Sequence, residues 1–144
     1  MSGGMVNDGQ VIAYTTATAI TYPGTLMKIT STAGTMDVCG AGEEPVGYAF
    51  TSTKHPVTGV ATADVKVGVH ALIPGQIVEI PLLATNAAIA IGDKVETVAA
   101  GEVDLKSGAG WIVGYALIAA ATNAGGTAAT KYIKVLVDKR YEAA

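Results

Sequence analysis

The stretch TKYIKVLVD, from Thr130 to Asp138, alternates apolar and polar positions with a period of two. In an extended chain this pattern places Ile133, Val135 and Val137 on one face. Runs of this length that are rich in β-branched residues are typical of strands with one buried face. We therefore predict a strand over this stretch, with these three side chains on one face and Tyr132, Lys134, Leu136 and Asp138 on the other.

The same pattern recurs through the rest of the chain. Three further stretches are read as strands: ADVKVGVH (63–70), GQIVEIP (75–81) and GDKVETV (92–98). The dipeptides Pro23-Gly24 and Pro74-Gly75 are typical of turns. No stretch longer than about ten residues shows firm helical periodicity. The sequence therefore predicts an all-β protein.

Two stretches of the chain resemble each other: GAGEEPVGYAF (Gly40–Phe50) and GAGWIVGYAL (Gly108–Leu117). Their flanks match as well, at a separation of 67 or 68 positions, through the pairs Tyr48 and Tyr115, Asp37 and Asp104, Gly34 and Gly101, Gly24 and Gly92. The repeat covers about residues 16–50 and 84–117. We expect two related β-meanders that close one small barrel or sandwich, with Gly47 and Gly114 where another backbone or ring comes close.

The length of 144 residues predicts a single domain, over residues 10–144. The preceding segment, residues 1–9, contains three glycines and little apolar surface. It is expected to be a flexible arm, because it has too little to bury to offset its ordering entropy. Two interpretations of this arm stay open: it orders along a partner surface, or it is a tail without function.

The charge balance bears on possible partners. The net charge is −3 without a basic cluster, which argues against nucleic acid. No apolar run reaches the ~20 residues of a membrane helix, and the first ten residues lack a signal-peptide pattern, so we expect no membrane partner and synthesis in the host cytoplasm. Only 15% of residues are charged, against about 25% in ordinary soluble domains. This low charge indicates either surface buried between subunits or an exterior with unusually little charge.

Few side chains are candidates for chemistry. The segment Gly108–Gly114 nearly spells a dinucleotide fingerprint, but its glycine spacing is wrong and it leads into a strand pattern. His55 and His70 lack the further ligands that zinc needs, and Cys39, the only cysteine, is predicted to be a buried structural thiol. We expect no nucleotide or zinc site.

Acidic and aromatic residues give no catalytic set either. Glu43 and Glu44 are adjacent and expected in solvent, so they cannot act as paired carboxylates. Asp37 and Asp104 occupy equivalent repeat positions, which favours a shared role in accepting backbone N–H bonds; a calcium site between the repeats is the alternative. Trp111 is assigned to core packing, with an interface anchor as the alternative. The sequence thus predicts no catalytic, cofactor-binding or metal site, no cofactor and no enzyme activity.

The order of these elements resembles a known family. GQVIAYT (9–15), VGVHALIPGQIVEIP (67–81), AIGDKVE (90–96), IVGYALIAA (112–120) and YIKVLVD (132–138) are similar, in that order, to small capsid decoration (cement) proteins of tailed phages. Gly92-Asp93, Gly114-Tyr115-Ala116 and Val135–Val137 fill the places of the family's characteristic elements. The resemblance implies a compact, usually oligomeric β fold bound to the outside of an assembled shell.

The expected function is therefore structural: a virion protein that decorates the outer surface of a phage head, binds the major capsid protein and stabilises capsomer contacts. A homotrimer is expected, because closed cyclic symmetry is usual and an icosahedral shell offers threefold axes. The alternative is a carbohydrate-binding or tail-associated β-barrel module. A small hydrolase or isomerase is the third and weakest possibility.

Overall fold

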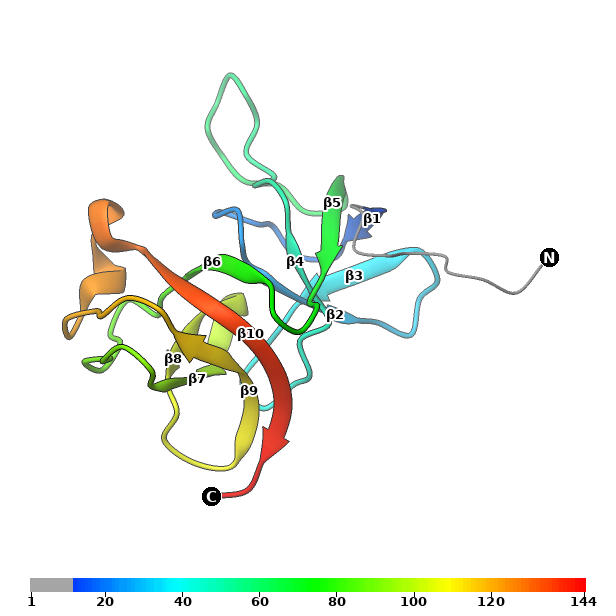
Figure 1. The fold of residues 1–144 in the computed structure, drawn as a ribbon. Coiled ribbons are helices and arrows are strands. Elements are labelled where there is room, and N and C mark those ends of the chain that lie inside the picture. The colour runs from blue at the N-terminus through cyan, green and yellow to red at the C-terminus, as the bar shows by residue number, and fades with distance from the viewer. Residues whose placement is uncertain (1–11) are drawn as a thin grey trace.

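The computed structural model describes residues 12–144, and it is all-β, as predicted. Its ten strands are β1 (Ile12–Thr16), β2 (Leu26–Ile29), β3 (Thr35–Val38), β4 (Gly47–Ala49), β5 (Lys66–Ala71), β6 (Ile77–Pro81), β7 (Lys94–Thr97), β8 (Val103–Leu105), β9 (Gly110–Ala116) and β10 (Tyr132–Glu142). Within the described part of the chain, helical structure is confined to three 3₁₀ turns: η1 (Ala99–Gly101), η2 (Ala124–Gly126) and η3 (Ala128–Thr130). Figure 1 shows the two groups of strands side by side.

The first five strands form a closed barrel in the order β1-β3-β2-β4-β5. Strands β1 and β3 pair in parallel, whereas the other neighbours are antiparallel. Strand β1 closes the barrel, because it pairs with β3 on one side and with β5 on the other. We call this unit the first barrel.

The last five strands repeat this arrangement in the order β6-β10-β9-β7-β8. A parallel bridge between Leu82 and Val103 links the two edges of the sheet, just after β6 and at the start of β8. The Leu83 N–H donates to the Val103 carbonyl at 3.0 Å, as the Ala17 N–H does to Met36 at the same distance in the first barrel. The second sheet therefore has the cyclic strand order of the first, and we call it the second barrel.

The strand registers show that the duplication includes all five strands of each barrel. Residues of β6 and β10 lie 66 positions after their equivalents in β1 and β5, those of β7 lie 68 after β2, and those of β8 and β9 lie 67 after β3 and β4. For example, Met27 pairs with Gly47, and Val95 pairs with Gly114. The repeat predicted for residues 16–50 and 84–117 is thus part of a longer one that includes both flanking strands.

The strand order within each repeat differs from the predicted meander. In the first barrel, β2 pairs with β3 on one side and with β4 on the other, and β4 does not pair with β3. In the second barrel, β7 lies in the same way between β8 and β9. A meander was inferred because sequence neighbours usually pair, and here closure of the barrel overrides that preference.

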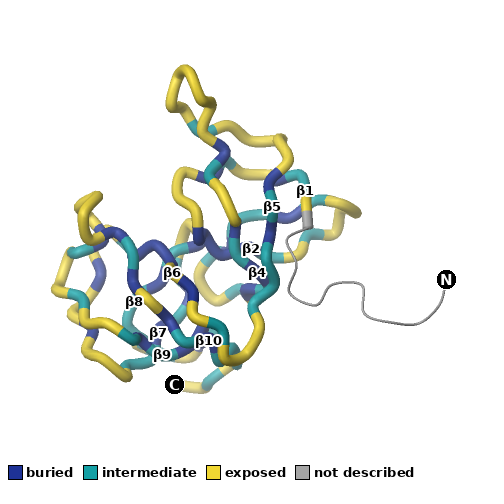
Figure 2. The backbone as a smooth tube through the Cα atoms, turned by 45° about the horizontal axis from the view of Figure 1, so that its top comes forward, coloured by how far each residue is buried: buried dark blue, intermediate teal, exposed yellow. Residues whose placement is uncertain are grey.

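Two clusters of buried side chains stabilise the fold. The smaller one fills the first barrel, with Met27, Met36 and Val69 among its members. The larger one fills the second barrel and extends to Leu26 and Cys39 of the first. The predicted last strand is confirmed, and the face that Ile133, Val135 and Val137 share lies in this larger cluster: all three are at 1% exposure or less. Figure 2 shows buried backbone running through both barrels.

Gly47 and Gly114 occupy equivalent places, in β4 and β9. A Cβ atom on Gly47 would lie 2.7 Å from the His70 carbonyl oxygen, and one on Gly114 would overlap the carbonyl oxygen of Leu136. Each glycine therefore allows a neighbouring strand of its barrel to approach closely, as predicted.

The predicted arm at residues 1–9 lies outside the described residues. Within residues 12–144, no helix is both long and apolar enough to cross a membrane.

Candidate functional site

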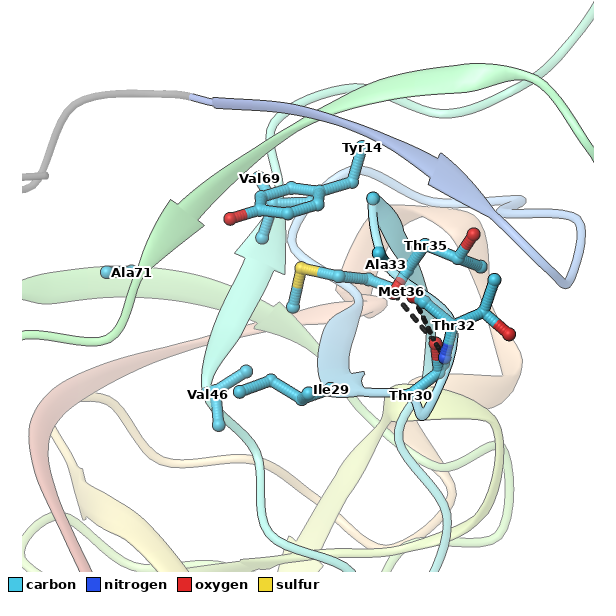
Figure 3. Close-up of a pocket in the computed structure, with 11 residues that line it drawn as sticks. Tyr14, Ile29, Thr30, Thr32, Ala33, Thr35, Met36, Val46, Val69 and Ala71 are labelled. Carbon is cyan, nitrogen blue, oxygen red and sulfur yellow. Dashed lines mark hydrogen bonds between the residues drawn. The ribbon is translucent and has the colours of Figure 1, made fainter. Parts of the chain in front are cut away.

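A shallow apolar hollow lies at the end of the first barrel that carries the β2–β3 turn. Its volume is about 280 Å³, and Figure 3 shows the side chains that surround it. The residues that line it are Tyr14, Ile29, Thr30, Thr32, Ala33, Gly34, Thr35, Met36, Val46, Val69 and Ala71. These side chains include no carboxylate, imidazole or thiol. The hollow is therefore suited to receive an apolar group and offers no acid or base at neutral pH.

The β2–β3 turn beside this hollow is held in shape by its own hydrogen bonds. The Thr30 hydroxyl donates to the Thr35 carbonyl at 2.9 Å and accepts the Thr32 N–H at 3.2 Å. Gly34 has a φ of +73°, a conformation that glycine adopts without steric cost. Ile29, the last residue of β2, is 71% exposed at the rim of the hollow. A preformed turn thus displays a large aliphatic side chain to solvent.

The loop between β4 and β5, residues 50–65, projects from the first barrel (Figure 1). It carries the exposed apolar side chains of Phe50, Val57 and Val60, with 60%, 86% and 61% of their surface accessible. Its shape is fixed internally, because the His55 N–H donates to the Val60 carbonyl at 2.9 Å and the Gly59 N–H donates to the His55 carbonyl at 2.8 Å. Figure 2 shows the projecting part as exposed. A shaped, exposed apolar loop is a typical contact surface for another protein.

A groove of about 490 Å³ runs between the first barrel and strand β6. Aromatic side chains of Tyr48, Phe50 and Tyr132 line it, together with Ile77, which is 64% exposed. Strand β6 lies at the edge of its sheet in the strand order. The groove thus offers apolar and aromatic surface beside a strand edge, again without a reactive group of its own other than Glu79.

The two histidines have structural partners and lie apart in the fold. In the projecting loop, His55 Nδ1 accepts the N–H groups of Val57 and Thr58, at 3.1 and 3.3 Å. His70 stacks on Tyr48 in the neighbouring strand, with ring centroids 5.2 Å apart. These contacts explain both histidines without a metal or a substrate.

Cys39 is fully buried, as predicted, and forms no disulfide. Burial raises the pKa of its thiol to about 12. The Sγ–H group donates to the Glu43 carbonyl at 3.4 Å. A thiol in this environment stays protonated at neutral pH and is a poor nucleophile.

The two adjacent glutamates, Glu43 and Glu44, were expected in solvent, but both form ion pairs. Glu43 pairs with Lys28 at 2.7 Å, and its other oxygen accepts the Gly40 N–H at 2.6 Å. These bonds, first that from Lys28 and then that from the backbone, lower the pKa of Glu43. Glu44 is exposed but pairs with Lys139 at 2.9 Å. Both carboxylates are therefore used to fix the loop that follows β3.

Asp37 and Asp104 play the same structural role in their two repeats, as predicted. Asp37 Oδ1 accepts the N–H of Val38 at 2.8 Å, and Asp104 Oδ1 accepts that of Leu105 at 2.7 Å. Each oxygen also accepts a second bond from the segment that precedes the repeat's first strand. Within residues 12–144, no three His, Cys, Asp or Glu side chains gather as metal ligands.

Trp111 lies in β9 and is only partly buried, so its assignment to the core is wrong. Its ring meets that of Tyr141 edge to face, with centroids 5.7 Å apart, and Tyr141 is exposed. Lys139 lies over the Trp111 ring at 5.8 Å. The register of β9 shifts between Ile112 and Gly114, so that the adjacent residues Ile112 and Val113 are both buried at zero exposure, whereas Trp111 stays partly exposed. Segment Gly110–Ala116 is a strand and opens no helix, in agreement with the argument against a nucleotide fingerprint.

One buried ion pair gave no signal in the sequence. Lys131 is 5% exposed; its Nζ donates to Glu102 and to the Leu82 carbonyl, the latter at 2.7 Å, and lies 4.8 Å from the centre of the Tyr22 ring. These groups join the start of β10, the start of β8 and the first barrel. Lys131 and Glu102 lie 29 residues apart in the sequence, so no local pattern predicts their contact. The network connects the two barrels, and the Lys131 charge is paired within it.

Comparison with known proteins adds no family to this description. No family model matches the chain, and no curated protein is significantly similar to it. The arrangement of exposed side chains therefore carries the functional argument.

Proposed function

We propose that this chain is a capsid decoration (cement) protein of a tailed phage. In this proposal it binds the major capsid protein on the outer surface of the assembled head, as a homotrimer, and stabilises the contacts between capsomers. The order of strand motifs noted in the sequence supports the assignment, together with a low charged fraction of 15%. The role is structural and requires no cofactor.

The observation that carries the proposal is the projecting loop, residues 50–65. It holds three large apolar side chains in solvent, with Val57 86% exposed at its far part, and its own hydrogen bonds fix its shape. Covering an exposed valine or phenylalanine contributes about 1.5–3 kcal/mol. A loop that is already ordered loses little entropy on binding, so most of this gain is kept.

A trimer makes such a loop effective on a shell. Three copies of the loop would meet three copies of the same capsid surface at a threefold axis. Linked binding sites raise the overall affinity well above that of one site, by about 10²–10⁴, without new kinds of contact. A small apolar loop is thus sufficient for stable decoration when it is presented three times.

The test is binding of the purified protein to assembled phage heads that lack it. Val57→Glu introduces a charge at the proposed contact, and we expect it to weaken binding by at least 10-fold in a sedimentation assay. Ile118→Glu is the matched control, because Ile118 is 39% exposed and belongs neither to the loop nor to the groove beside β6. If Val57→Glu binds as tightly as the unaltered protein, the loop is not part of the contact. Failure of the unaltered protein to bind heads would reject the function itself.

A further inference from the structure

The two barrels of this chain meet end to end. We call the end of a barrel with the β2–β3 or β7–β8 turn its turn end, and the opposite end, where the chain enters β2 or β7, its entry end. The turn end of the second barrel lies against the entry end of the first: the Gly101 N–H donates to the Cys39 carbonyl at 2.7 Å, and the Thr97 hydroxyl to the Glu43 carbonyl at 3.4 Å. A Cβ atom on Gly101 would overlap Thr25. The junction is therefore closely packed.

The turn end of the first barrel is the duplicate of that packed surface, and nothing described covers it. Gly34 is equivalent to Gly101 and has nearly the same φ, +73° against +68°, but a Cβ atom there would meet nothing within 4 Å. Ile29 is equivalent to Thr97. Thr97 is 4% exposed in the junction, whereas Ile29 is 71% exposed beside the apolar hollow (Figure 3).

The entry end of the second barrel is the duplicate of the other side of the junction, and it too is open. The Lys106 N–H donates to the Lys94 carbonyl at 3.0 Å, as the Cys39 N–H does to the Leu26 carbonyl at 2.9 Å, so Lys106 holds the place in the second barrel that Cys39 holds in the first. Ile91, just before this end of β7, is 70% exposed. Among residues 12–144, no hydrogen bond uses the Lys106 carbonyl or the Gly34 N–H.

We propose that a second copy of this chain docks on the first through these two open ends and repeats the intramolecular junction. The Gly34 N–H of one copy donates to the Lys106 carbonyl of the next, and Ile91 of that copy enters the hollow beside Ile29. The two ends lie on opposite sides of the molecule: in Figure 1 the β2–β3 turn is at the right and the segment between β6 and β7 at the left. The contact is therefore head-to-tail, and it closes into a ring when the rotation between copies permits.

The chemistry of the two surfaces suits this contact. The β2–β3 turn, residues 30–34, contains no charged side chain, so little charge is desolvated on its side. On the other side, Lys94 and Lys106 hold the places of Leu26 and Cys39, which are buried at the junction. Lys94 is paired with Glu142 at 2.8 Å, and Lys106 Nζ donates to the Gly108 carbonyl at 2.8 Å. The one new polar contact is a backbone hydrogen bond, which does not depend on the side chains by which the two repeats differ. This inference rests on one part of the proposed function, the homo-oligomer. It does not require that the protein bind a capsid.

The test uses two variants that each block one end. Ile29→Glu blocks the turn end of the first barrel and leaves the entry end of the second barrel intact. Ile91→Glu blocks that entry end and leaves the turn end intact. Both side chains are exposed, so both variants are expected to fold, which circular dichroism and the melting temperature will verify. Val57→Glu is the control for an added surface charge. In sedimentation velocity, we expect the unaltered chain and the control to assemble, and each blocked variant to associate about 100-fold more weakly.

Mixing the two blocked variants gives the decisive result. Each variant keeps the end that is blocked in the other. The entry end of Ile29→Glu can therefore bind the turn end of Ile91→Glu, and a 1:1 mixture should form a heterodimer that grows no further. A self-symmetric contact through either end alone would leave one variant assembled like the unaltered chain, and this would overturn the proposal. So would a monomeric unaltered chain, or a mixture that stays monomeric. Head binding by Ile29→Glu, measured separately, distinguishes loss of self-association from failure of the capsid role.

Discussion

Replacement of Gly114 by alanine tests how closely the last two long strands approach each other. Gly114 pairs with Val137 across β9 and β10. The added Cβ atom would overlap the Leu136 carbonyl oxygen and lie 2.8 Å from its carbonyl carbon and 3.0 Å from Val135 Cγ1. Backbone, unlike the end of a side chain, cannot move aside alone, so the two strands must separate locally.

The expected cost follows from that geometry. Overpacking of a filled core costs about 1–3 kcal/mol, and each weakened ladder hydrogen bond adds about 1 kcal/mol. We therefore expect Gly114→Ala to lower the free energy of unfolding by about 3–5 kcal/mol. For a domain of this size, 3 kcal/mol corresponds to a melting temperature lower by about 10 °C.

Urea unfolding followed by the fluorescence of Trp111, which lies in the same strand, measures this change. Gly108→Ala is the matched control, since its Cβ atom would meet nothing within 4 Å and its φ is not positive. The control should change stability by less than about 0.5 kcal/mol. A loss below 1 kcal/mol for Gly114→Ala would refute the argument that the two strands require glycine at their closest approach.

Three further predictions concern single side chains. The buried side chain of Asn86 makes three hydrogen bonds, two of which hold the segment after β9, so Asn86→Ala should destabilise the protein by about 2–4 kcal/mol in thermal unfolding, while the exposed neighbour Thr85→Ala should not. Cys39, whose pKa is raised to about 12 by burial, should react with a thiol reagent at pH 8 only after unfolding in urea; rapid labelling of the folded protein would contradict its burial. Glu43 has a lowered pKa in the folded state, so its pairing with Lys28 stabilises the protein above about pH 4.5 and this contribution is lost as the pH falls through the lowered value. Urea midpoints between pH 3 and 7 should therefore fall less steeply for Glu43→Gln than for the unaltered chain.

The candidate surfaces show where sequence interpretation succeeds and where it stops. The buried thiol of Cys39 and the shared role of Asp37 and Asp104 were predicted, because each depends on a residue's own chemistry or on a local turn. The outward position of Trp111 was not predicted. A side chain in a strand takes one of two faces, and the choice follows from the register of the sheet, which no local pattern reveals.

The sequence by itself determined the strands and the internal repeat. Alternation at Ile133, Val135 and Val137 is a local property, and it forces one face of an extended chain into the core wherever that strand lies. Only the tertiary structure decided how the strands close. The parallel pairing of β1 with β3 joins segments about 20 residues apart, so no single stretch of sequence reveals it. The flanking strands of the repeat, at an offset of 66 and not 67 or 68, were likewise recognised only from the strand registers. The tertiary structure also gave equivalent positions opposite fates. Thr97 is buried and Ile29 is exposed, since exposure depends on which surface lies across from a residue and not on its place in the repeat.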